Sequence, residues 1–359
     1  MRFNFYSPVA FEPWDWRNSV EKGIGGSETS HVEMAWRLAR RGHEVVTYAP
    51  VPDDCPGTWR DTVWHPLDEV DWSRSGVWVL YRCPEKVLEF DVARADQVRW
   101  LMMQDWDYPW QPEYVEHLDR LMVLSQVHAR WVVAQHPELA EKMFVTGNGV
   151  KGDLIEEVEA LGVPFRNPFR VMYASSPDRG LKTLLQIFER AQEFVPELAL
   201  YSFYGFDNID KMGGYYQKEK AWILKRVEQN QAIHFQGRVP QRQLYREWLQ
   251  TAILCYPSDF WETGFITGQE AQCLGAIPLT SSAWAQGEVC RHGVLIPGSA
   301  QGDALVQARY MGQLVRLASD HDWQAAIRAV MIPEARKRCD WENYVDQWIV
   351  EAERCCVER

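Results

Sequence analysis

The chain has 359 residues, of which 46% are hydrophobic and 25% are charged. These proportions are ordinary for a folded globular protein, and they exclude a disordered or fibrous chain. The length exceeds what one α/β core usually holds, so we expect two domains with a cleft between them.

The negative charge of the chain is concentrated in its first half. The formal net charge is -12, and residues 1–170 contain 18 Lys and Arg against 27 Asp and Glu. Such a surface repels nucleic-acid backbones and anionic lipids unless a local basic patch offsets it. Charge therefore disfavours stable binding to nucleic acid without excluding it.

Hydropathy and cysteine spacing exclude two further classes. No apolar stretch approaches the roughly 20 residues that a membrane-spanning helix needs, and we expect a cytoplasmic protein without a transmembrane segment. The eight cysteines show neither CxxC pairs nor zinc-type spacing, so we expect reduced thiols.

Short β-like runs alternate with helical stretches, which is typical of parallel sheets built from βα units. In the first half the predicted strands are 2–7, 44–49, 77–81, 98–103, 121–124 and 144–146. An acidic helical piece and a proline-containing segment follow within 151–168, and we interpret the end of this stretch as a linker. A second series then begins, with predicted strands 169–174, 198–204, 232–236, 253–256, 277–280 and 294–296 and a helix over 181–194. We therefore expect two doubly wound sheets, with ligands at the carboxyl ends of the strands.

The first candidate motif is a glycine-rich turn that follows strand 2–7 and opens an amphipathic helix. Gly25 and Gly26 permit close approach of the backbone, and a helix start offers free N–H groups to an anion. The alternative is a purely structural helix start capped by Ser27.

The second motif follows the first strand of the second half. Arg179 and Lys182 lie at a helix start, where cations oppose the helix dipole unless an anionic ligand compensates them. A diphosphate suits this pair, because Arg offers a planar fork and Lys a point charge. The alternative is a solvated basic turn.

The third motif is a pair of glutamates, Glu262 and Glu270, with seven residues between them. If a helix begins near Ile266, Glu270 lies in its first turns and Glu262 lies in the preceding loop. The backbone N–H groups of Phe265, Ile266 and Thr267 then face the ligand. One carboxylate suits a ribose and the other a sugar hydroxyl, whereas the alternative for both is capping or solvation.

With these three motifs in this order, the chain resembles the family 4 retaining glycosyltransferases of GT-B fold. The resemblance covers nearly the whole chain, because Ser125 and residues 148–150 also match the ends of that family's N-terminal strands. It implies two Rossmann-like domains, namely an acceptor domain over 1–162 and a nucleotide-sugar donor domain over 163–339. It also implies a last helix, within about 340–359, that crosses back onto the first domain.

The resemblance implies a role for each motif. Glu262 would contact the donor sugar, Glu270 would hydrogen-bond the ribose, and Arg179 with Lys182 would bind the diphosphate. The full set of expected donor contacts also contains the main chain of Gly25, Gly26, Gly237, Val239, Phe265, Ile266 and Thr267. Because the base would be read by main chain near Gly237, a UDP-sugar and a GDP-sugar are both compatible.

The reaction implied by the resemblance passes through an oxocarbenium-like state and retains the anomeric configuration. The departing phosphate oxygen takes the acceptor proton, so no protein nucleophile is required. Arg179 and Lys182 would stabilise the charge that develops on the diphosphate. We expect no metal, because these cations replace it.

The chain departs from the family at one position. Many relatives carry a His-Asp pair where this chain has Gln104 and Asp105. Gln hydrogen-bonds a sugar hydroxyl but carries no proton, so any acid/base role would pass to Asp105. The alternative for Asp105 and Asp107 is turn formation. Five histidines show no partner spacing that indicates a site: His31, His43, His65, His128 and His234.

The sequence therefore predicts a hexosyltransferase whose acceptor is a hydroxyl on a glycan, a lipid-linked sugar or a small molecule. The alternatives are transfer to hydroxylated bases in nucleic acid, a nucleotide-sugar hydrolase or epimerase, and an inactive nucleotide- or glycan-binding module. Trp14, Trp16, Trp106 and Trp110 fall in apparent loops and suit stacking on sugars or flipped bases. The alternative is that most tryptophans fill cores and interdomain seams. The oligomeric state is not indicated by sequence.

Overall fold

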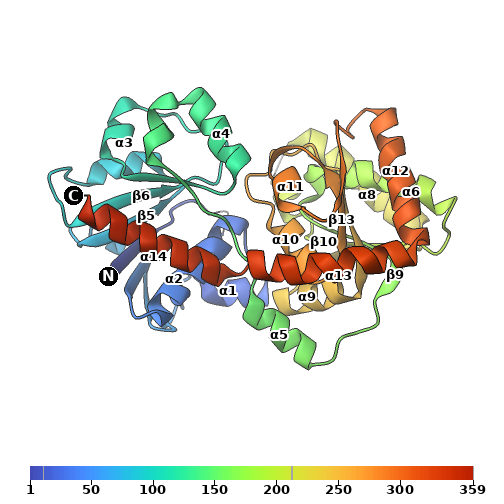
Figure 1. Cartoon of the computed structure of the whole chain (residues 1–359), viewed down its shortest axis with the longest axis horizontal. Coiled ribbons are helices and arrows are strands. Elements are labelled where there is room, and N and C mark those ends of the chain that lie inside the picture. Colours follow the sequence, from blue (N-terminus) through green and yellow to red (C-terminus); the bar gives the residue numbers. More distant parts are fainter. Residues whose placement is uncertain (11, 212, 359) are drawn as a thin grey trace. The chain divides into compact units, whose positions relative to one another are not determined.

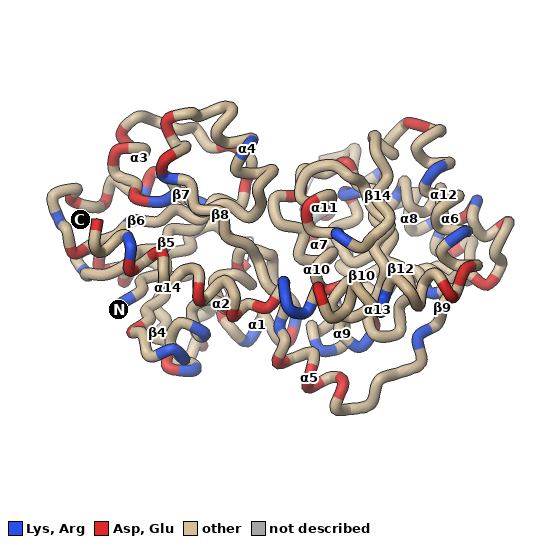
Figure 2. The backbone as a smooth tube through the Cα atoms, in the orientation of Figure 1, with Lys and Arg blue, Asp and Glu red and all other residues tan. Residues whose placement is uncertain are grey.

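The computed structural model describes residues 1–10, 12–211 and 213–358. The chain divides into two compact units, one formed by Met1–Gly149 with Asp340–Arg359 and the other by Val150–Cys339. Each unit is a mainly parallel sheet covered by helices (Figure 1), as predicted. Acidic and basic residues are interspersed along both units (Figure 2). No described helix combines the length and apolarity that crossing a bilayer requires.

The first unit contains an eight-stranded sheet in the order β3-β4-β2-β1-β5-β6-β7-β8. Its strands are β1 (Arg2–Tyr6), β2 (Glu44–Tyr48), β3 (Thr58–Trp59), β4 (Thr62–His65), β5 (Gly76–Tyr81), β6 (Gln97–Met102), β7 (Arg120–Val123) and β8 (Met143–Val145). The pairs are parallel except β3 with β4. Chain order reverses between β1 and β5, which makes the end of this strand pair a switch point.

All six predicted strands of the first half are present, whereas the β3–β4 hairpin was not predicted. Its turn is made by Arg60 and Asp61, both in the left-handed region with φ of 45° and 64°. Turns of this kind are usually recognised by Asn or Gly, and the two strands are too short to show a period of two.

Helices cover both faces of the first sheet. They are α1 (Trp16–Glu21), α2 (Gly26–Arg40), α3 (Pro112–His117), α4 (Gln126–Gln135) and α14 (Trp341–Val357), with short 3-10 turns η1 (Leu67–Glu69), η2 (Pro84–Glu89) and η3 (Pro137–Lys142). Alternate residues along each strand enter different cores: Val77 and Val79 of β5 pack with α2 and α14, and Trp78 and Leu80 pack on the opposite face. Burial of both faces explains the nearly continuous apolar runs of the strands.

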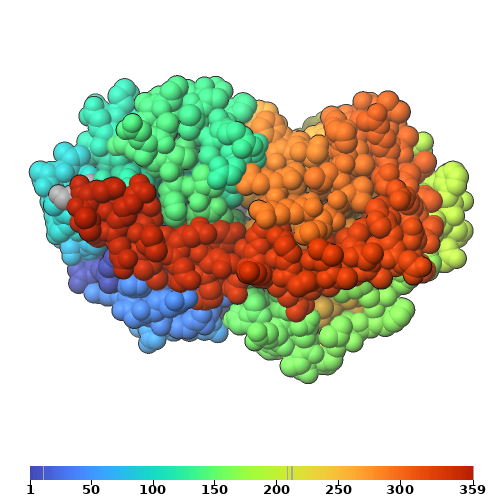
Figure 3. Space-filling model, in the orientation of Figure 1, coloured from blue at the N-terminus to red at the C-terminus, as the bar shows by residue number. Residues whose placement is uncertain are grey.

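The C-terminal helix α14 packs on the first unit, as expected for the predicted return. It begins at Trp341, after the capping residue Asp340. The Trp348 ring is fully buried against β1 and β6, and its Nε1 donates to Thr146 Oγ1 at 2.8 Å. The outer side of the helix forms part of the molecular surface (Figure 3). Residue 359 of the predicted range lies outside the described residues.

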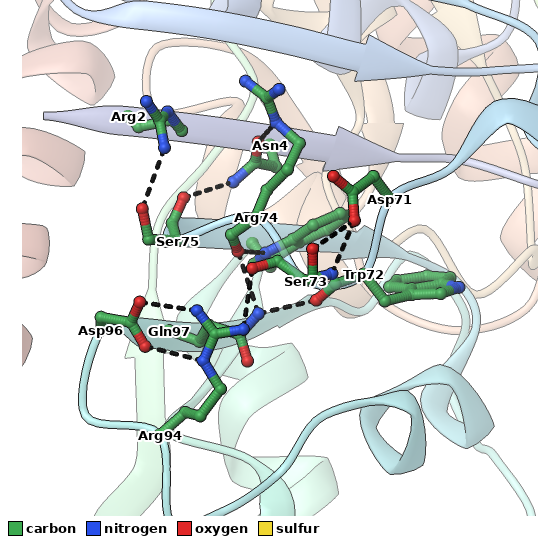
Figure 4. Close-up of polar contacts among 11 residues, drawn as sticks. Arg2, Asn4, Asp71, Trp72, Ser73, Arg74, Ser75, Arg94, Asp96 and Gln97 are labelled. Atoms are coloured by element: carbon green, nitrogen blue, oxygen red, sulfur yellow. Dashed lines mark hydrogen bonds and ion pairs between the residues drawn. The ribbon is translucent and has the colours of Figure 1, made fainter.

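Buried amides hold the segment that leads into β5 (Figure 4). Asn4 is fully buried in β1 and its Nδ2 donates to the Ser75 carbonyl at 3.1 Å, while Arg74 Nε donates to Asn4 Oδ1 at 3.1 Å. Gln97 Nε2 donates to the carbonyl groups of Trp72 and Arg74 at 2.7 and 2.9 Å. These polar residues within apolar strands satisfy loop backbone that would otherwise be buried without partners.

The second unit contains a six-stranded parallel sheet in the order β11-β10-β9-β12-β13-β14. Its strands are β9 (Asn167–Ala174), β10 (Ala199–Phe203), β11 (Ile233–Gly237), β12 (Thr251–Tyr256), β13 (Ile277–Ser281) and β14 (Val294–Ile296). Its helices are α5 (Gly152–Ala160), α6 (Leu181–Gln192), α7 (Asp207–Asp210), α8 (Gly214–Gln229), α9 (Gln241–Gln250), α10 (Ile266–Cys273), α11 (Trp284–Val289), α12 (Ala304–Ser319) and α13 (His321–Arg338), with the 3-10 turn η4 (Pro177–Arg179). In chain order the strands read 3-2-1-4-5-6, which is the Rossmann order, and its switch point lies between β9 and β12. All six predicted strands of the second half are present.

The first unit ends at Gly149, earlier than the boundary predicted at residue 162. The acidic helix α5 belongs to the second unit, where Glu157 pairs with Arg242 and Glu159 pairs with Arg336 at 2.6 Å. Its cationic partners are distant in the sequence, so the sequence alone did not indicate that this helix belongs to the second unit.

Trp14 and Trp16 fill a core, in agreement with the alternative, and the prediction that they stack on a ligand is wrong. Both are buried in a small aromatic core of the first unit, where the Trp16 ring stacks on Trp59 and the Trp14 ring meets Trp64 edge-on. Trp16 also begins α1. Neither indole is available to stack on a sugar or a base.

We expect Gly149→Ala to destabilise the first unit. An added Cβ would lie 2.6 Å from Cγ of Trp341, so the first residue of α14 would have to move. Overpacking of this kind typically costs about 1–3 kcal/mol, and the thermal unfolding midpoint should fall. The control is Gly312→Ala in α12, where an added Cβ meets nothing within 4 Å and should preserve or raise the midpoint. Equal midpoints for wild type and Gly149→Ala would contradict this account of the α14 contact.

Candidate functional site

The turn after β9 carries Arg179 and approaches the loop after β12. Arg179 ends η4, and Gly180 follows with φ of 110°. A Cβ at Gly180 would lie 2.8 Å from the carbonyl oxygen of Pro257. Glycine is therefore required twice here, for the left-handed conformation and for the close approach of two backbones.

This approach brings Arg179 and Glu262 together at the switch point of the second sheet. Arg179 Nη1 donates to Glu262 Oε1 at 3.3 Å, and the buried Tyr256 hydroxyl donates to the same oxygen at 2.7 Å. The guanidinium carbon of Arg179 also lies 3.9 Å from the ring centroid of Phe260. The carboxylate of Glu262 is thus fixed by two donors from neighbouring strands.

Electrostatic interactions keep the Arg179 guanidinium charged and the Tyr256 hydroxyl protonated. Burial lowers the pKa of Arg179, but the Glu262 carboxylate opposes this effect and the net pKa is raised above the ordinary value. Burial, followed by Glu262, raises the pKa of Tyr256 well above the ordinary value, so Tyr256 stays a donor. Arg179 Nε is buried and has no hydrogen-bond partner among the described residues, which leaves a donor for an anion.

Lys182 lies one turn further along, in the first turn of α6. Its ammonium group is 5.9 Å from the ring centroid of Trp222 in α8. Within the described part of the chain, no carboxylate lies within ion-pair distance of it. Both predicted cations therefore lie at the carboxyl end of β9, and Lys182 interacts electrostatically with Glu219 without a close ion pair among the described residues.

Glu270 lies in α10 in a different environment. Its side chain is buried, and its Oε1 accepts from Gln241 Nε2 of α9 at 2.9 Å. Burial raises the pKa of Glu270 to about 6, although Gln241 and Lys151 act in the opposite direction. Sequence analysis missed Gln241 and Lys151, because a Gln on a helix and a Lys after a strand carry no distinctive pattern.

The helix α10 begins at Ile266, as predicted. The residue before it, Phe265, is in the left-handed region with φ of 44°, and the start has no side-chain cap. The Phe265 ring stacks on Tyr256, and Thr267 Oγ1 donates to the carbonyl of Ala174 at 3.1 Å. These contacts tie the start of α10 to the ends of β9 and β12 and leave its backbone N–H groups without a side-chain acceptor.

The predicted base-reading segment follows β11. Gly237 has φ of 70°, and its carbonyl accepts from the backbone of Tyr204 at 3.0 Å. The Arg238 guanidinium lies over the Tyr204 ring at 5.4 Å, and Val239 comes next in the chain. The carboxyl ends of parallel strands share one edge, so this turn lies on the same edge of the second sheet as Arg179 and Glu262.

In the first unit, Asp105 is held by an ion pair. Arg82 donates to both of its carboxylate oxygens, at 2.8 and 3.1 Å. Arg82 follows β5 with φ of 59°, whereas Gln104 and Asp105 follow β6. The structure therefore places Gln104 and Asp105 where the sequence predicted, and it adds Arg82, which sequence analysis missed.

His128 was also missed as a member of this cluster. Its Nε2 donates to the Asp105 carbonyl at 3.1 Å, and burial lowers its pKa to about 4. Its Nδ1 is buried with no hydrogen-bond partner in the portion of the chain described. The partner lies far away in sequence, so no spacing pattern indicated this histidine.

The carboxylate of Glu28 lies beside the glycine-rich turn, which the sequence did not predict. Gly25 is the N-cap of α2, and a Cβ there would collide with the carboxylate of Glu28. Burial raises the pKa of Glu28, and Arg82 opposes that shift. A phosphate at this helix start would need Glu28 to turn away or to bind a proton, and the expected phosphate contact of Gly25 and Gly26 stays a prediction.

Metal binding has no preformed candidate in the residues that the structure describes. No three His, Cys, Asp or Glu side chains there come together as a possible ion-binding group. The expectation of a metal-independent site stays a prediction.

Comparison with known proteins gives no match to a family model or to a curated protein, but solved structures match over the whole chain. Sucrose-phosphate synthase from Thermosynechococcus elongatus has a TM-score of 0.71 and 12% identity over 99% of this chain and 100% of that one. The catalytic domain of starch synthase IV from Arabidopsis thaliana, bound to ADP and acarbose, has a TM-score of 0.71 and 10% identity over 99% of each chain. HepE from Anabaena, in complex with UDP, has a TM-score of 0.67 and 16% identity over 99% of this chain and 100% of that one.

The chain has the GT-B fold. In all three comparisons the match covers at least 99% of both chains, which supports this assignment. At identities of 10–16%, the similarity shows the fold alone. Against S. aureus TarM the TM-score is 0.59, and the chain spans 55% of that longer protein. The GT-B fold contains two Rossmann-like sheets, in agreement with the two units described above.

The ionisation of Glu270 predicts a pH dependence of stability. The pKa in the folded protein is about 6, above the unfolded value, so the folded state binds the proton more tightly. The free energy of unfolding should then fall as pH rises from the ordinary glutamate range to about 6, in total by about 2 kcal/mol. Glu270→Gln should remove this decline, which urea unfolding at a series of pH values would measure. A constant difference between wild type and Glu270→Gln across this window would contradict it.

Proposed function

We propose that this protein is a retaining glycosyltransferase that transfers a hexosyl group from a UDP-sugar or GDP-sugar to a hydroxyl of a glycan, a lipid-linked sugar or a small molecule. The observation that carries the proposal is the meeting of Arg179 and Glu262 at the switch point of the second sheet. Doubly wound sheets bind their ligands at such points. The GT-B fold supports the proposal, since solved relatives of this fold hold UDP or ADP.

In this proposal Arg179 and Lys182 bind the donor diphosphate. Among the described residues, the buried Nε of Arg179 has no acceptor, and no carboxylate lies within ion-pair distance of Lys182. The main-chain N–H groups of Phe265, Ile266 and Thr267 add donors at the start of α10. Fixed donors that are already oriented stabilise the negative charge of the leaving diphosphate without reorganisation during the reaction.

The two glutamates take separate parts of the donor. Glu270, oriented by Gln241, accepts hydrogen bonds from the ribose hydroxyls, and its pKa of about 6 leaves it mostly ionised at neutral pH. Glu262 accepts from a hydroxyl of the transferred sugar while Tyr256 and Arg179 hold its other contacts. The main chain at Gly237 and Val239 contacts the base.

The reaction needs no protein nucleophile. The bond between the anomeric carbon and the phosphate oxygen breaks, and the bond to the acceptor oxygen forms on the same face. The acceptor proton passes to the departing phosphate oxygen. Arg179 is the residue best placed for the developing charge, because its fork matches two phosphate oxygens.

The first unit is the acceptor domain in this proposal, and the second is the donor domain. Gln104 hydrogen-bonds an acceptor hydroxyl, and Asp105 is oriented by Arg82 for the same task. The contact of Gly25 and Gly26 with the phosphates rests on the family resemblance alone.

Donor binding and turnover test the proposal together. A thermal-shift panel of UDP, GDP, ADP and their hexose conjugates should give a shift with one nucleotide class, because a ligand specific to the folded state raises its melting temperature. With that donor, Arg179→Ala and Glu262→Ala should each lower kcat by about 10²–10³-fold. The control is Arg190→Ala at the exposed far end of α6. Wild-type turnover in both site variants would overturn the assignment of the site.

Metal independence has its own test. Because Arg179 and Lys182 supply the positive charge at the diphosphate, dialysis against EDTA should leave kcat unchanged within a factor of about two, and added Mg²⁺ or Mn²⁺ should not raise it. A loss of activity that either metal restores would show that the two cations are insufficient.

A further inference from the structure

Two indoles form an aromatic pair beside Glu262. The ring centroids of Trp261 and Trp284 are 4.6 Å apart, and their planes are tilted by 35°. Trp261 immediately precedes Glu262 and is 44% exposed. Trp284 opens α11 after β13, the strand next to β12. The Ala285 backbone N–H donates to the Glu262 carbonyl at 3.1 Å, so the two loops are joined at the glutamate itself.

The backbone of Trp284 is strained. Its φ is 49°, in the left-handed region, where a bulky side chain is a rare outlier and a glycine would be comfortable. Strain of this kind persists where the surroundings enforce it, and it concentrates at functional sites. The chain keeps an indole at a position where its backbone conformation favours the smallest residue.

The aromatic surface continues on the Arg179 side of the glutamate. Phe260 is 41% exposed, and the Arg179 guanidinium lies over its ring. The consecutive residues Phe260, Trp261 and Glu262 thus place apolar faces next to a fixed carboxylate and a cation. A pyranose ring needs this combination, because its C–H face packs on an aromatic ring while its hydroxyls hydrogen-bond charged groups.

We propose that Trp261 and Trp284 form a stacking platform for the pyranose ring of the donor, and that this platform selects the hexose. The proposal rests on the proposed function, since it adds the sugar contact to the donor site of Arg179 and Glu262. The occupant is the transferred hexosyl group, because both indoles flank the backbone of Glu262, the residue assigned to that sugar. The nucleotide is bound by other residues, so loss of the indoles affects the sugar contribution alone.

The test distinguishes the contribution of the sugar to donor binding from the contribution of the nucleotide. Calorimetric titration measures Kd for the nucleoside diphosphate and for its hexose conjugate, in wild type, Trp261→Ala and Trp284→Gly. Both variants should bind the bare nucleotide as wild type does and should bind the conjugate about ten-fold more weakly. Trp284→Gly relieves the left-handed strain, so it keeps the test valid if Trp261→Ala folds poorly. Trp261→Tyr should recover part of the loss, since a phenol ring also stacks on a sugar.

The control is Tyr215→Ala, an aromatic of the same unit that is 61% exposed in α8, which should change neither Kd. An unchanged ratio of the two Kd values in both indole variants would overturn the platform. So would a rise in the acceptor KM with donor Kd unchanged, which would assign the indoles to the acceptor. Failure of wild type to bind any nucleotide would instead overturn the proposed function. Binding of the nucleotide without any gain from the sugar would overturn the platform alone.

Discussion

The candidate site depends on the contact of two backbones, the turn after β9 and the loop after β12. Gly180 lets the turn pass against the Pro257 carbonyl, and no other residue combines its φ with the space available. This contact places the guanidinium of Arg179 within reach of Glu262, although 82 residues separate them in the chain. The sheet order makes the meeting possible, because β9 and β12 are neighbours at the point where the strand order reverses.

The two glutamates of the third motif show how one fold gives the same side chain two environments. Glu262 lies in a loop and is fixed by Tyr256 and Arg179, whose hydrogen bonds reach a single carboxylate oxygen. Glu270 lies in a helix and is buried, and its Oε1 accepts from Gln241 Nε2 at 2.9 Å. Because two donors hold Glu262 while burial raises the pKa of Glu270, the two carboxylates suit different hydroxyl partners.

Sequence was a good guide to the sheets and a poor guide to the partners of the charged residues. All the long strands could be predicted, since burial of both faces leaves nearly continuous apolar runs such as 77–81 and 98–103. The β3–β4 hairpin could not, because Arg60 and Asp61 occupy turn positions that carry no glycine signal. The start of α10 near Ile266 was predicted, whereas the hydrogen bond between Arg179 and Glu262 was not. Gln241, Arg82 and His128 were not predicted either, because each acts through a contact made only by the tertiary fold.

Arg82 and His128 both contact Asp105 near the ends of β5 and β6, and these three residues concern the question of whether the reaction has a protein base. Many relatives of the resembled family carry a histidine where this chain has Gln104, and here the nearby histidine, His128, is buried and neutral with its Nε2 bound to the Asp105 carbonyl. Asp105 itself is bound by Arg82 through both oxygens. Both of its carboxylate oxygens are therefore engaged as hydrogen-bond acceptors of Arg82. A mechanism in which the leaving phosphate takes the acceptor proton requires no base at this position, so the loss of the histidine and the pairing of the aspartate are compatible with transfer.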